Sequence, residues 1–265
     1  MSSTLRRTWS VVGVLATAVL SLATTASAQG AAPSQEKAPP IVGGQPAPIA
    51  EHPWVVYLTD GSGNQFCGGT IARPDKIVTA AHCVTGDAPK IAEVVAGREN
   101  KQSQDGTVAK VSNVWVHPKY QGADTGADVA VVTLDRKLQE KPLALASGQD
   151  ASLYSPGTPT QVYGWGATQE GGEPSDTLRK ADVQVFGDQD CTKAYQQYKP
   201  DAMVCAGVPQ GGMDSCQGDS GGPLVAGDKL IGIVSTGNGC ARPGYPGIYT
   251  RVGAYFNDLQ PQLGS

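Results

Sequence analysis

The sequence predicts an all-β protein. Glycine (34) and proline (19) together make up about a fifth of the 265 residues, whereas charged residues make up only 17%. This composition is typical of a chain with many turns and short strands. The strand-like runs, separated by Gly, Pro, Asn or Asp, are WVVYL, KIVTAA, AEVVAG, DVAVVTL, TQVYGWG, ADVQVF, KLIGIVS and GIYTRV. Many short strands favour a β-barrel or a β-sandwich.

Residues 1–28 are predicted to be a signal peptide. Arg6 and Arg7 precede an apolar stretch (VVGVLATAVLSL), and residues 26–28 (ASA) form a small-residue cleavage site. A membrane anchor fits poorly because the apolar core is short. The arginine pair leaves twin-arginine export as an alternative, but the ordinary secretory route is favoured. We therefore expect a secreted, extracellular protein with no membrane partner.

The segment 29–40 (QGAAPSQEKAPP) is rich in proline, alanine and glutamine and has no hydrophobic periodicity. It is predicted to be a short propeptide without structure of its own. The folded domain is expected to begin at Ile41. The net charge of −4, without basic runs, argues against a nucleic-acid partner.

The later strands differ in their patterns. In the run ADVQVF, Ala181, Val183 and Val185 share one face, which predicts a half-buried strand. The run DVAVVTL is continuously apolar and should be buried on both faces. Two stretches look helical: one runs from Asp188, a plausible N-cap, through CTKAYQQY, and the other is VGAYFNDLQ near the C-terminus.

All six cysteines follow the signal segment. They are Cys67, Cys83, Cys191, Cys205, Cys216 and Cys240. An even number of cysteines in a secreted chain predicts three disulfides, although sequence alone leaves their pairing open. Metal binding is disfavoured because the chain has no C-x-x-C pair and only three histidines.

Ser220 is the candidate nucleophile. It lies in Gly218-Asp219-Ser220-Gly221-Gly222, which matches the G-x-S-x-G pattern of α/β-hydrolases. In that fold the histidine follows the serine, whereas here every histidine precedes Ser220, so an α/β-hydrolase is excluded.

A serine nucleophile needs a base and an acid that orients the base. His82 is the preferred base because the neighbouring Cys83 would pin its loop, whereas His52 and His117 are each followed by proline. Asp128 is the preferred acid because it opens a buried strand-like run. Asp124, in a flexible-looking turn, is the alternative.

The motifs TAAHC, DVAVV and GDSGGP, carrying His82, Asp128 and Ser220 in that order, resemble the chymotrypsin-type serine peptidases of the trypsin branch. IVGG at 41–44, SCQGDSGGPLV and GCARPGYPGIYTRV strengthen the resemblance, which spans Ile41 to about residue 259. The chain is most similar in character to the secreted bacterial, actinomycete-type trypsins.

The resemblance implies two six-stranded antiparallel β-barrels, spanning residues 41–147 and 148–265, with a C-terminal helix and an active site between the barrels. His82 and Asp128 would come from the first barrel and Ser220 from the second. The amides of Gly218 and Ser220 would form the oxyanion hole. It also implies the disulfide pairs Cys67–Cys83, Cys191–Cys205 and Cys216–Cys240.

The resemblance gives the two aspartates near Ser220 different roles. Asp219 would pair with the α-amino group of Ile41 after cleavage of a zymogen. Asp214 would form the base of a specificity pocket for Arg or Lys, because a buried carboxylate needs a cationic partner. Four further pocket positions are also implied. Gly237 and Gly247 would form its walls, Gln217 its rim, and Ser235 would bind Asp128 and contact the substrate.

Two positions depart from the family pattern. Thr236 replaces the usual tryptophan, which predicts weaker selectivity for residues two to four positions before the scissile bond. Pro40 replaces the usual Lys or Arg before IVGG, which predicts activation by a different protease.

The sequence thus predicts a monomeric serine endopeptidase with protein or peptide substrates, an activating protease and protein protease inhibitors as partners. No cofactor or metal is required. The loop 98–107 (RENKQSQDGT) leaves calcium binding for stability open, but calcium is not predicted because the loop lacks a clear ligand set. The alternatives are a catalytically inactive homologue that acts as a binding module, a chymotrypsin-like specificity, and a hydrolase of small esters.

Overall fold

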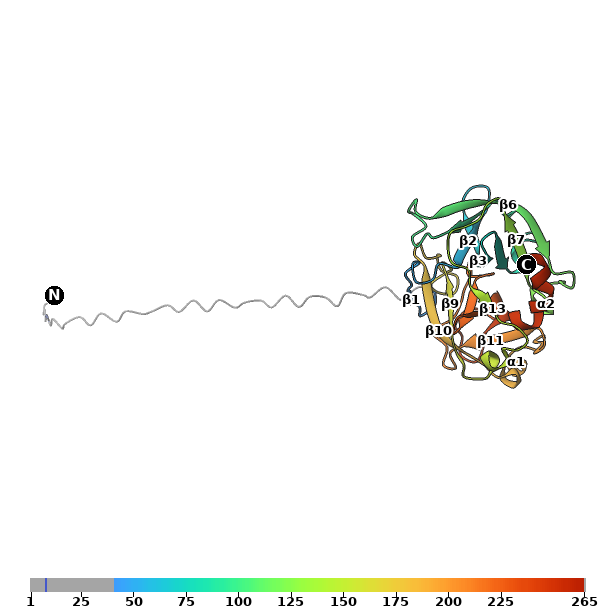
Figure 1. Ribbon diagram of the computed structural model, residues 1–265. Helices are drawn as coiled ribbons and strands as arrows, with labels where there is room; N and C mark the ends of the chain where they lie inside the picture. Colours follow the sequence, from blue (N-terminus) through green and yellow to red (C-terminus); the bar gives the residue numbers. More distant parts are fainter. Residues whose placement is uncertain (1–7, 9–40, 265) are drawn as a thin grey trace. The chain divides into compact units, whose positions relative to one another are not determined.

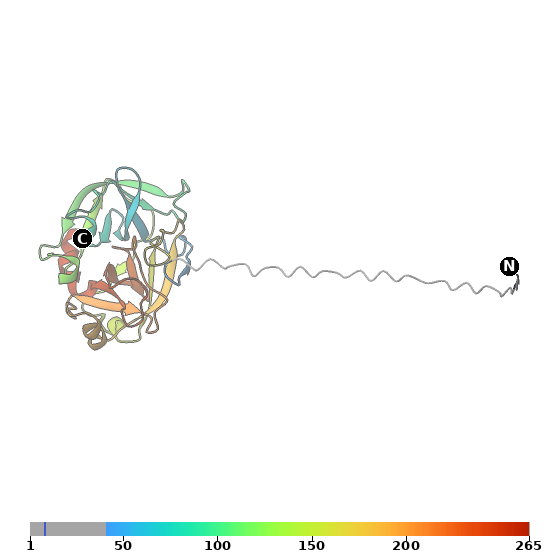
Figure 2. The same ribbon diagram turned by 180° about the vertical axis from the view of Figure 1, so that it is seen from behind.

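The structure is a computed structural model that describes residue 8 and residues 41–264. The predicted signal peptide and propeptide therefore fall, apart from Thr8, outside the described residues. From Ile41 onward the chain forms two closed antiparallel β-barrels, as the resemblance implies. The strands of the two barrels occupy separate halves of the folded region, which can be followed from both sides (Figures 1 and 2).

The first barrel closes in the order β2-β3-β4-β7-β6-β5, and every neighbouring pair is antiparallel. Its strands are β2 (Val55–Thr59), β3 (Gln65–Arg73), β4 (Lys76–Thr79), β5 (Glu93–Ala96), β6 (Thr107–Val116) and β7 (Ala130–Leu134). Four of the five residues of β7 are buried, as its continuous apolar run predicts. A closed barrel leaves this sheet no free edge.

The second barrel closes in the order β9-β10-β11-β14-β13-β12. Its strands are β9 (Pro159–Gly164), β10 (Arg179–Val185), β11 (Met203–Gly207), β12 (Pro223–Ala226), β13 (Lys229–Thr236) and β14 (Gly247–Arg251). The predicted alternation in β10 is confirmed, because Ala181, Val183 and Val185 are buried while Asp182 between them is exposed. Two short strands extend this sheet: β1 (Gln45–Pro46) pairs with β10 and β8 (Ala144–Leu145) pairs with β13.

Both predicted helices are present, with two corrections to the first. The first, α1 (Asp188–Ala194), is capped by Gly187, so Asp188 is the first helical residue and not the N-cap. Its carboxylate instead accepts a hydrogen bond from Tyr198 Oη at 2.6 Å. The helix also ends before the predicted QQY, because Tyr195 already has extended backbone dihedrals.

The C-terminal helix α2 (Val252–Leu263) packs against β13 of the second barrel and β7 of the first. Two hydrogen bonds fix it to the first barrel. Tyr255 Oη accepts a bond from the Ala127 amide at 2.7 Å, and Asp258 contacts the buried His117 ring at 3.2 Å. This helix therefore holds the loop that leads into β7, where Asp128 lies.

Candidate active site

Asp128 is completely buried between η2 (Ala123–Thr125) and β7. Its Oδ1 accepts a hydrogen bond from the His82 amide at 2.9 Å, and its Oδ2 lies 2.8 Å from His82 Nδ1. The same Oδ2 accepts a bond from Ser235 Oγ at 2.6 Å. Thr250 Oγ1 donates to the Asp128 carbonyl at 2.7 Å. Groups from both barrels thus hold this carboxylate in one orientation.

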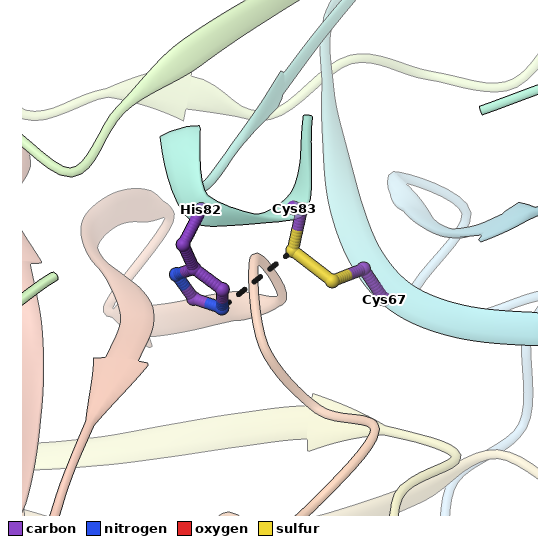
Figure 3. Close-up of side chains that lie close together, drawn as sticks. All are labelled: Cys67, His82 and Cys83. Atoms are coloured by element: carbon purple, nitrogen blue, oxygen red, sulfur yellow. Dashed lines mark hydrogen bonds between the residues drawn. A yellow bond between two sulfur atoms is a disulfide. The ribbon is translucent and has the colours of Figure 1, made fainter. Parts of the chain in front are cut away.

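His82 lies on a single 3₁₀ turn, η1 (Ala81–Cys83), whose last residue forms a disulfide with Cys67 of β3 (Figure 3). Because the Asp128 carboxylate can only accept, Nδ1 carries the proton of this hydrogen bond, and in the neutral ring the lone pair is then on Nε2. Nε2 lies 3.8 Å from Cys83 Sγ. Although Cys67, His82 and Cys83 are close enough to suggest a metal site, both sulfur atoms belong to the disulfide and provide no thiolate.

Ser220 lies in a tight turn that the first barrel helps to hold. Its carbonyl accepts a hydrogen bond from the Gly68 amide of β3 at 2.7 Å. Gly221 has φ +80°, and a Cβ there would lie 2.2 Å from Thr79 Oγ1, so only glycine fits. Ser220 and His82 line the same cavity of about 710 Å³. Within residues 41–264 no hydrogen bond joins Ser220 Oγ to His82 Nε2; such contacts often tighten only when substrate binds.

The backbone amides of Gly218 and Ser220 are free of protein partners. Neither N–H donates a hydrogen bond to any residue in the described part of the chain. By contrast, the amide of Asp219, which lies between them, and the amide of Gly221, which follows, each donate a hydrogen bond. Gly218 has φ +94°, a conformation that favours glycine. Two unpaired amides beside a serine hydroxyl are the arrangement that stabilises an oxyanion.

Asp214 lines a second cavity, of about 160 Å³, together with Ser220. Its carboxylate is 3% exposed and accepts hydrogen bonds from the Ser215 amide at 2.8 Å and the Ala241 amide at 3.1 Å. Burial raises the pKa of Asp214 to about 7, and the nearby Asp219 adds to the rise. A cationic ligand group in this cavity would relieve that desolvation.

The other predicted pocket residues line the same cavity: Gln217, Ser235, Thr236, Gly237 and Gly247. A Cβ at position 247 would lie 2.8 Å from Asp214 Oδ1, so a side chain there would obstruct the carboxylate. At position 237 a Cβ would meet only ordinary contacts, the nearest at 3.6 Å. Cys216 and Cys240, which also line the cavity, are joined by a disulfide.

Asp219 is fully buried beneath the turn. Its Oδ1 accepts a hydrogen bond from the Gly166 amide at 2.7 Å and its Oδ2 accepts one from the Cys216 amide at 2.9 Å. Burial raises the pKa of Asp219 to about 7, although these hydrogen bonds and the charge of Lys101 act in the opposite direction. Asp219 lines neither of the two cavities that Ser220 lines.

Ile41 is completely buried in the core of the second barrel. The segment that follows it is fixed by the Asp214 amide, which donates to the Val42 carbonyl at 3.1 Å. In the continuous chain the Ile41 nitrogen is part of the peptide bond to Pro40. Among the described residues Ile41 and Asp219 form no ion pair, so their predicted partnership belongs to the cleaved chain.

The structure contains the three disulfides that the resemblance implies: Cys67–Cys83, Cys191–Cys205 and Cys216–Cys240. The second joins α1 to β11, away from the site. The other two lie beside His82 and beside the Asp214 cavity. No helix among the described residues is long and apolar enough to cross a membrane.

Several residues that support the site were not predicted from the sequence. Gly164 and Gly166 flank Trp165, and a Cβ at either position would lie within 2.5 Å of the Asp219 carboxylate. Gly68 and Tyr255, described above, anchor Ser220 and the Asp128 loop. The GWG tripeptide was a visible signal, whereas nothing in the sequence marks Gly68 or Tyr255 as partners of distant residues.

Comparison with known proteins agrees with this geometry. The family model described as Trypsin matches residues 41–259. The chain belongs to the trypsin family. Its match to a trypsin of Saccharopolyspora erythraea is 54% identical and covers 85% of this chain and 99% of that protein. Trypsin 5G1 of Aedes aegypti is 40% identical, with 80% of both chains covered, and a vitellin-degrading protease of Bombyx mori is 40% identical, with 81% and 82% covered.

Membership of this family and the two barrels make the protein a trypsin-like serine peptidase of the chymotrypsin fold and of bacterial type. Its substrates are proteins. The α/β-hydrolase alternative is thereby excluded on structural grounds as well as on the order of its residues.

Proposed function

We propose that the mature chain is a secreted endopeptidase that cleaves after Arg or Lys through an acyl-enzyme intermediate. Ser220 is the nucleophile, His82 the general base and acid, and Asp128 the group that orients His82. The observation that supports the specificity is the buried Asp214 carboxylate, which has no cationic partner among the described residues and lines the cavity that opens on Ser220. An Arg or Lys side chain of the substrate supplies that partner.

The reaction follows from the geometry in two stages. Ser220 Oγ attacks the substrate carbonyl carbon as its proton passes to His82 Nε2, and the carbonyl oxygen becomes an oxyanion bound by the free amides of Gly218 and Ser220. The Asp128 carboxylate stabilises the imidazolium that forms. His82 then protonates the leaving amine. In the second stage water, deprotonated by His82, attacks the acyl-enzyme and releases the carboxylic acid and Ser220.

The chain is proposed to be made as a zymogen with a signal peptide (1–28) and a propeptide (29–40). Cleavage before Ile41 frees an ammonium group that pairs with Asp219. Such a pair is strongly favoured, because a buried carboxylate left alone costs several kcal/mol, typically about 3–5. The buried position of Ile41 and the raised pKa of Asp219 support this pairing.

The activating protease is proposed to be a different enzyme. Pro40 precedes the cleavage site, and Lys37, the nearest basic residue, would leave Ala38-Pro39-Pro40 ahead of Ile41. Protein protease inhibitors that present Arg or Lys to the Asp214 cavity are the expected natural ligands besides substrates. The mature enzyme is proposed to act as a monomer.

The decisive experiment compares kcat/KM of the processed protein on matched peptide anilides that end in Arg, Lys, Phe or Leu. We expect Arg and Lys to be preferred by about 10⁴-fold. Ser220→Ala, verified to begin at Ile41, is the matched control and should abolish turnover of all four. A preference for Phe would contradict the role of Asp214. No turnover by the unaltered protein would favour an inactive homologue.

A further inference from the structure

The loop between β5 and β6, for which the sequence predicts no function, is hydrogen-bonded to residues beside the active site. Glu99, an acid of this loop, already accepts hydrogen bonds from other protein groups. Its Oε2 accepts a hydrogen bond from the Ile49 amide at 3.0 Å, and its carbonyl accepts from Trp165 Nε1 at 2.8 Å and the Leu178 amide at 2.9 Å. The loop is therefore a structural junction between the two barrels.

From this junction Lys101 reaches toward the nucleophile turn. Its amide donates to the Asp176 carbonyl at 2.8 Å, which fixes the start of the side chain. Its Nζ donates to Gln65 Oε1 at 2.9 Å. The side chain is partly buried, and burial lowers the pKa of Lys101 while the charges of Asp176 and Asp219 raise it. The ammonium is thus hydrogen-bonded to Gln65, in a region where the charges of two acids favour its protonated form.

Gln65 connects Lys101 to Gly218 of the predicted oxyanion hole. Because Lys101 Nζ can only donate, it determines which end of the Gln65 amide is the oxygen. The Nε2 end then donates to the Gly218 carbonyl at 2.8 Å. Gly218 has φ +94° and no side chain, so its conformation depends on the hydrogen bonds of the peptide groups on either side of it.

We infer that Gln65 and Lys101 are positioning residues that hold the Gly218 amide toward the substrate oxyanion. This inference rests on the proposed function. The Gly218 N–H shares a peptide plane with the Gln217 carbonyl, which accepts a hydrogen bond from the Ala167 amide at 2.7 Å. Gln65 holds the next plane, that of the Gly218 carbonyl. With both planes held, φ and ψ at Gly218 are set and the peptide group that carries the N–H cannot turn away from the substrate. The energetic consequence appears when negative charge develops on the substrate oxygen, because misaligned donors stabilise it less. Binding of the Arg or Lys side chain at Asp214 involves neither residue.

The test uses the processed enzyme with Gln65→Glu and Lys101→Met. The glutamate keeps the size of the side chain and its partner Lys101 but cannot donate to Gly218. We expect each variant to lower kcat on an Arg anilide about 10-fold, with KM nearly unchanged. Affinity for a peptide arginine aldehyde, whose adduct with Ser220 occupies the oxyanion hole, should fall by a similar factor. Affinity for a benzamidine-type amidinium, which needs only the Asp214 cavity, should stay within about 2-fold.

Three controls separate positioning from general damage. Lys137→Met and Gln139→Glu make the same exchanges at exposed positions of one loop remote from the site and should leave all constants unchanged. Lys101→Arg, which retains a donor to Gln65, should recover most of kcat. In the double variant Lys101→Met should add little to Gln65→Glu, because both act through one hydrogen bond.

The outcomes distinguish this inference from the proposed function. An unaltered enzyme that does not cleave after Arg or Lys would overturn both. An active enzyme whose variants keep full kcat and aldehyde affinity would overturn the positioning role alone. Equal weakening of aldehyde and amidinium would also overturn it, since that pattern indicates a collapsed site.

Discussion

The two barrels contribute differently to the candidate site. The first barrel presents His82 and Asp128, whose polar groups are paired with each other and with Ser235 and Thr250. The second presents two buried carboxylates, Asp214 and Asp219, neither with a salt-bridge partner among the described residues, and two free amides. The base and its acid are therefore already paired in the uncleaved chain, whereas under the proposed function the two buried carboxylates receive their partners, a substrate cation and an N-terminal ammonium, only later.

This difference indicates where the enzyme is regulated. Changes on the first barrel should alter the chemistry itself in every state of the chain. Changes on the second should depend on the substrate, on cleavage and on pH, because a buried charge becomes favourable only when its partner arrives. The predictions below use that contrast.

The largest effect is expected at the Asp214 cavity. Asp214→Ser removes the carboxylate that a cationic substrate needs, so kcat/KM on Arg and Lys anilides should fall about 10⁴-fold. Turnover of a Leu anilide should be retained, because His82 and Asp128 remain paired. Steady-state kinetics on the four anilides measure both. An equal loss on all substrates would show that the variant damages the turn and not the selectivity.

The second prediction concerns the N-terminus. A chain processed to begin at Ala38 should be about 10³-fold less active than one that begins at Ile41, because its ammonium group cannot reach the buried Asp219. Mass spectrometry identifies the N-terminus and an Arg anilide measures the activity. Spontaneous maturation of purified precursor to Ile41 that is abolished by Ser220→Ala would contradict activation by another protease.

The third prediction concerns the pH dependence of precursor stability. The folded-state pKa values of Asp214 and Asp219, each about 7, lie above the unfolded value near 3.8. Their contribution to stability is therefore fully present below about pH 4 and is lost as pH rises through about 7. The Tm of the Ser220→Ala precursor should fall by several degrees between pH 5 and 8 relative to its Asp219→Asn derivative.

Cleavage should remove part of this dependence. In the mature Ser220→Ala chain the Ile41 ammonium stabilises ionised Asp219, which lowers its pKa and flattens the curve. Calorimetry on matched precursor and mature samples tests this. Identical pH curves for the two forms would rule out the pairing of Ile41 with Asp219.

The smallest effect is expected at Thr236. A tryptophan there would restore a broad apolar wall beside the cavity, and KM for peptides with an apolar residue two to four positions before the scissile bond should fall about 10-fold. The value of kcat should change little, since position 236 touches neither His82 nor Ser220. Unchanged KM across a series of such peptides would contradict this role for the side chain.

Much of the site could be read from local motifs. TAAHC, DVAVV and GDSGGP contain His82, Asp128 and Ser220, and the structure brings the three toward one cleft from both barrels. The predicted strands at β7 and β10 also appear, because continuous and alternating hydrophobic patterns report directly on burial. The prediction of Asp188 as the N-cap of α1 was wrong. Several residues near a helix start can satisfy the first amides of the helix, and packing decides among them.

The sequence by itself determined the all-β class, the cysteine framework and the chemical identity of the site residues, since these depend on composition and on short motifs. Only the tertiary structure decided how that site is supported. Gly68 holds the Ser220 carbonyl, Tyr255 holds the loop before Asp128, and Gln65 with Lys101 holds Gly218. These partners lie far apart in the chain and carry no motif, because hydrogen bonds between distant segments depend on barrel closure and packing, which local sequence patterns do not encode.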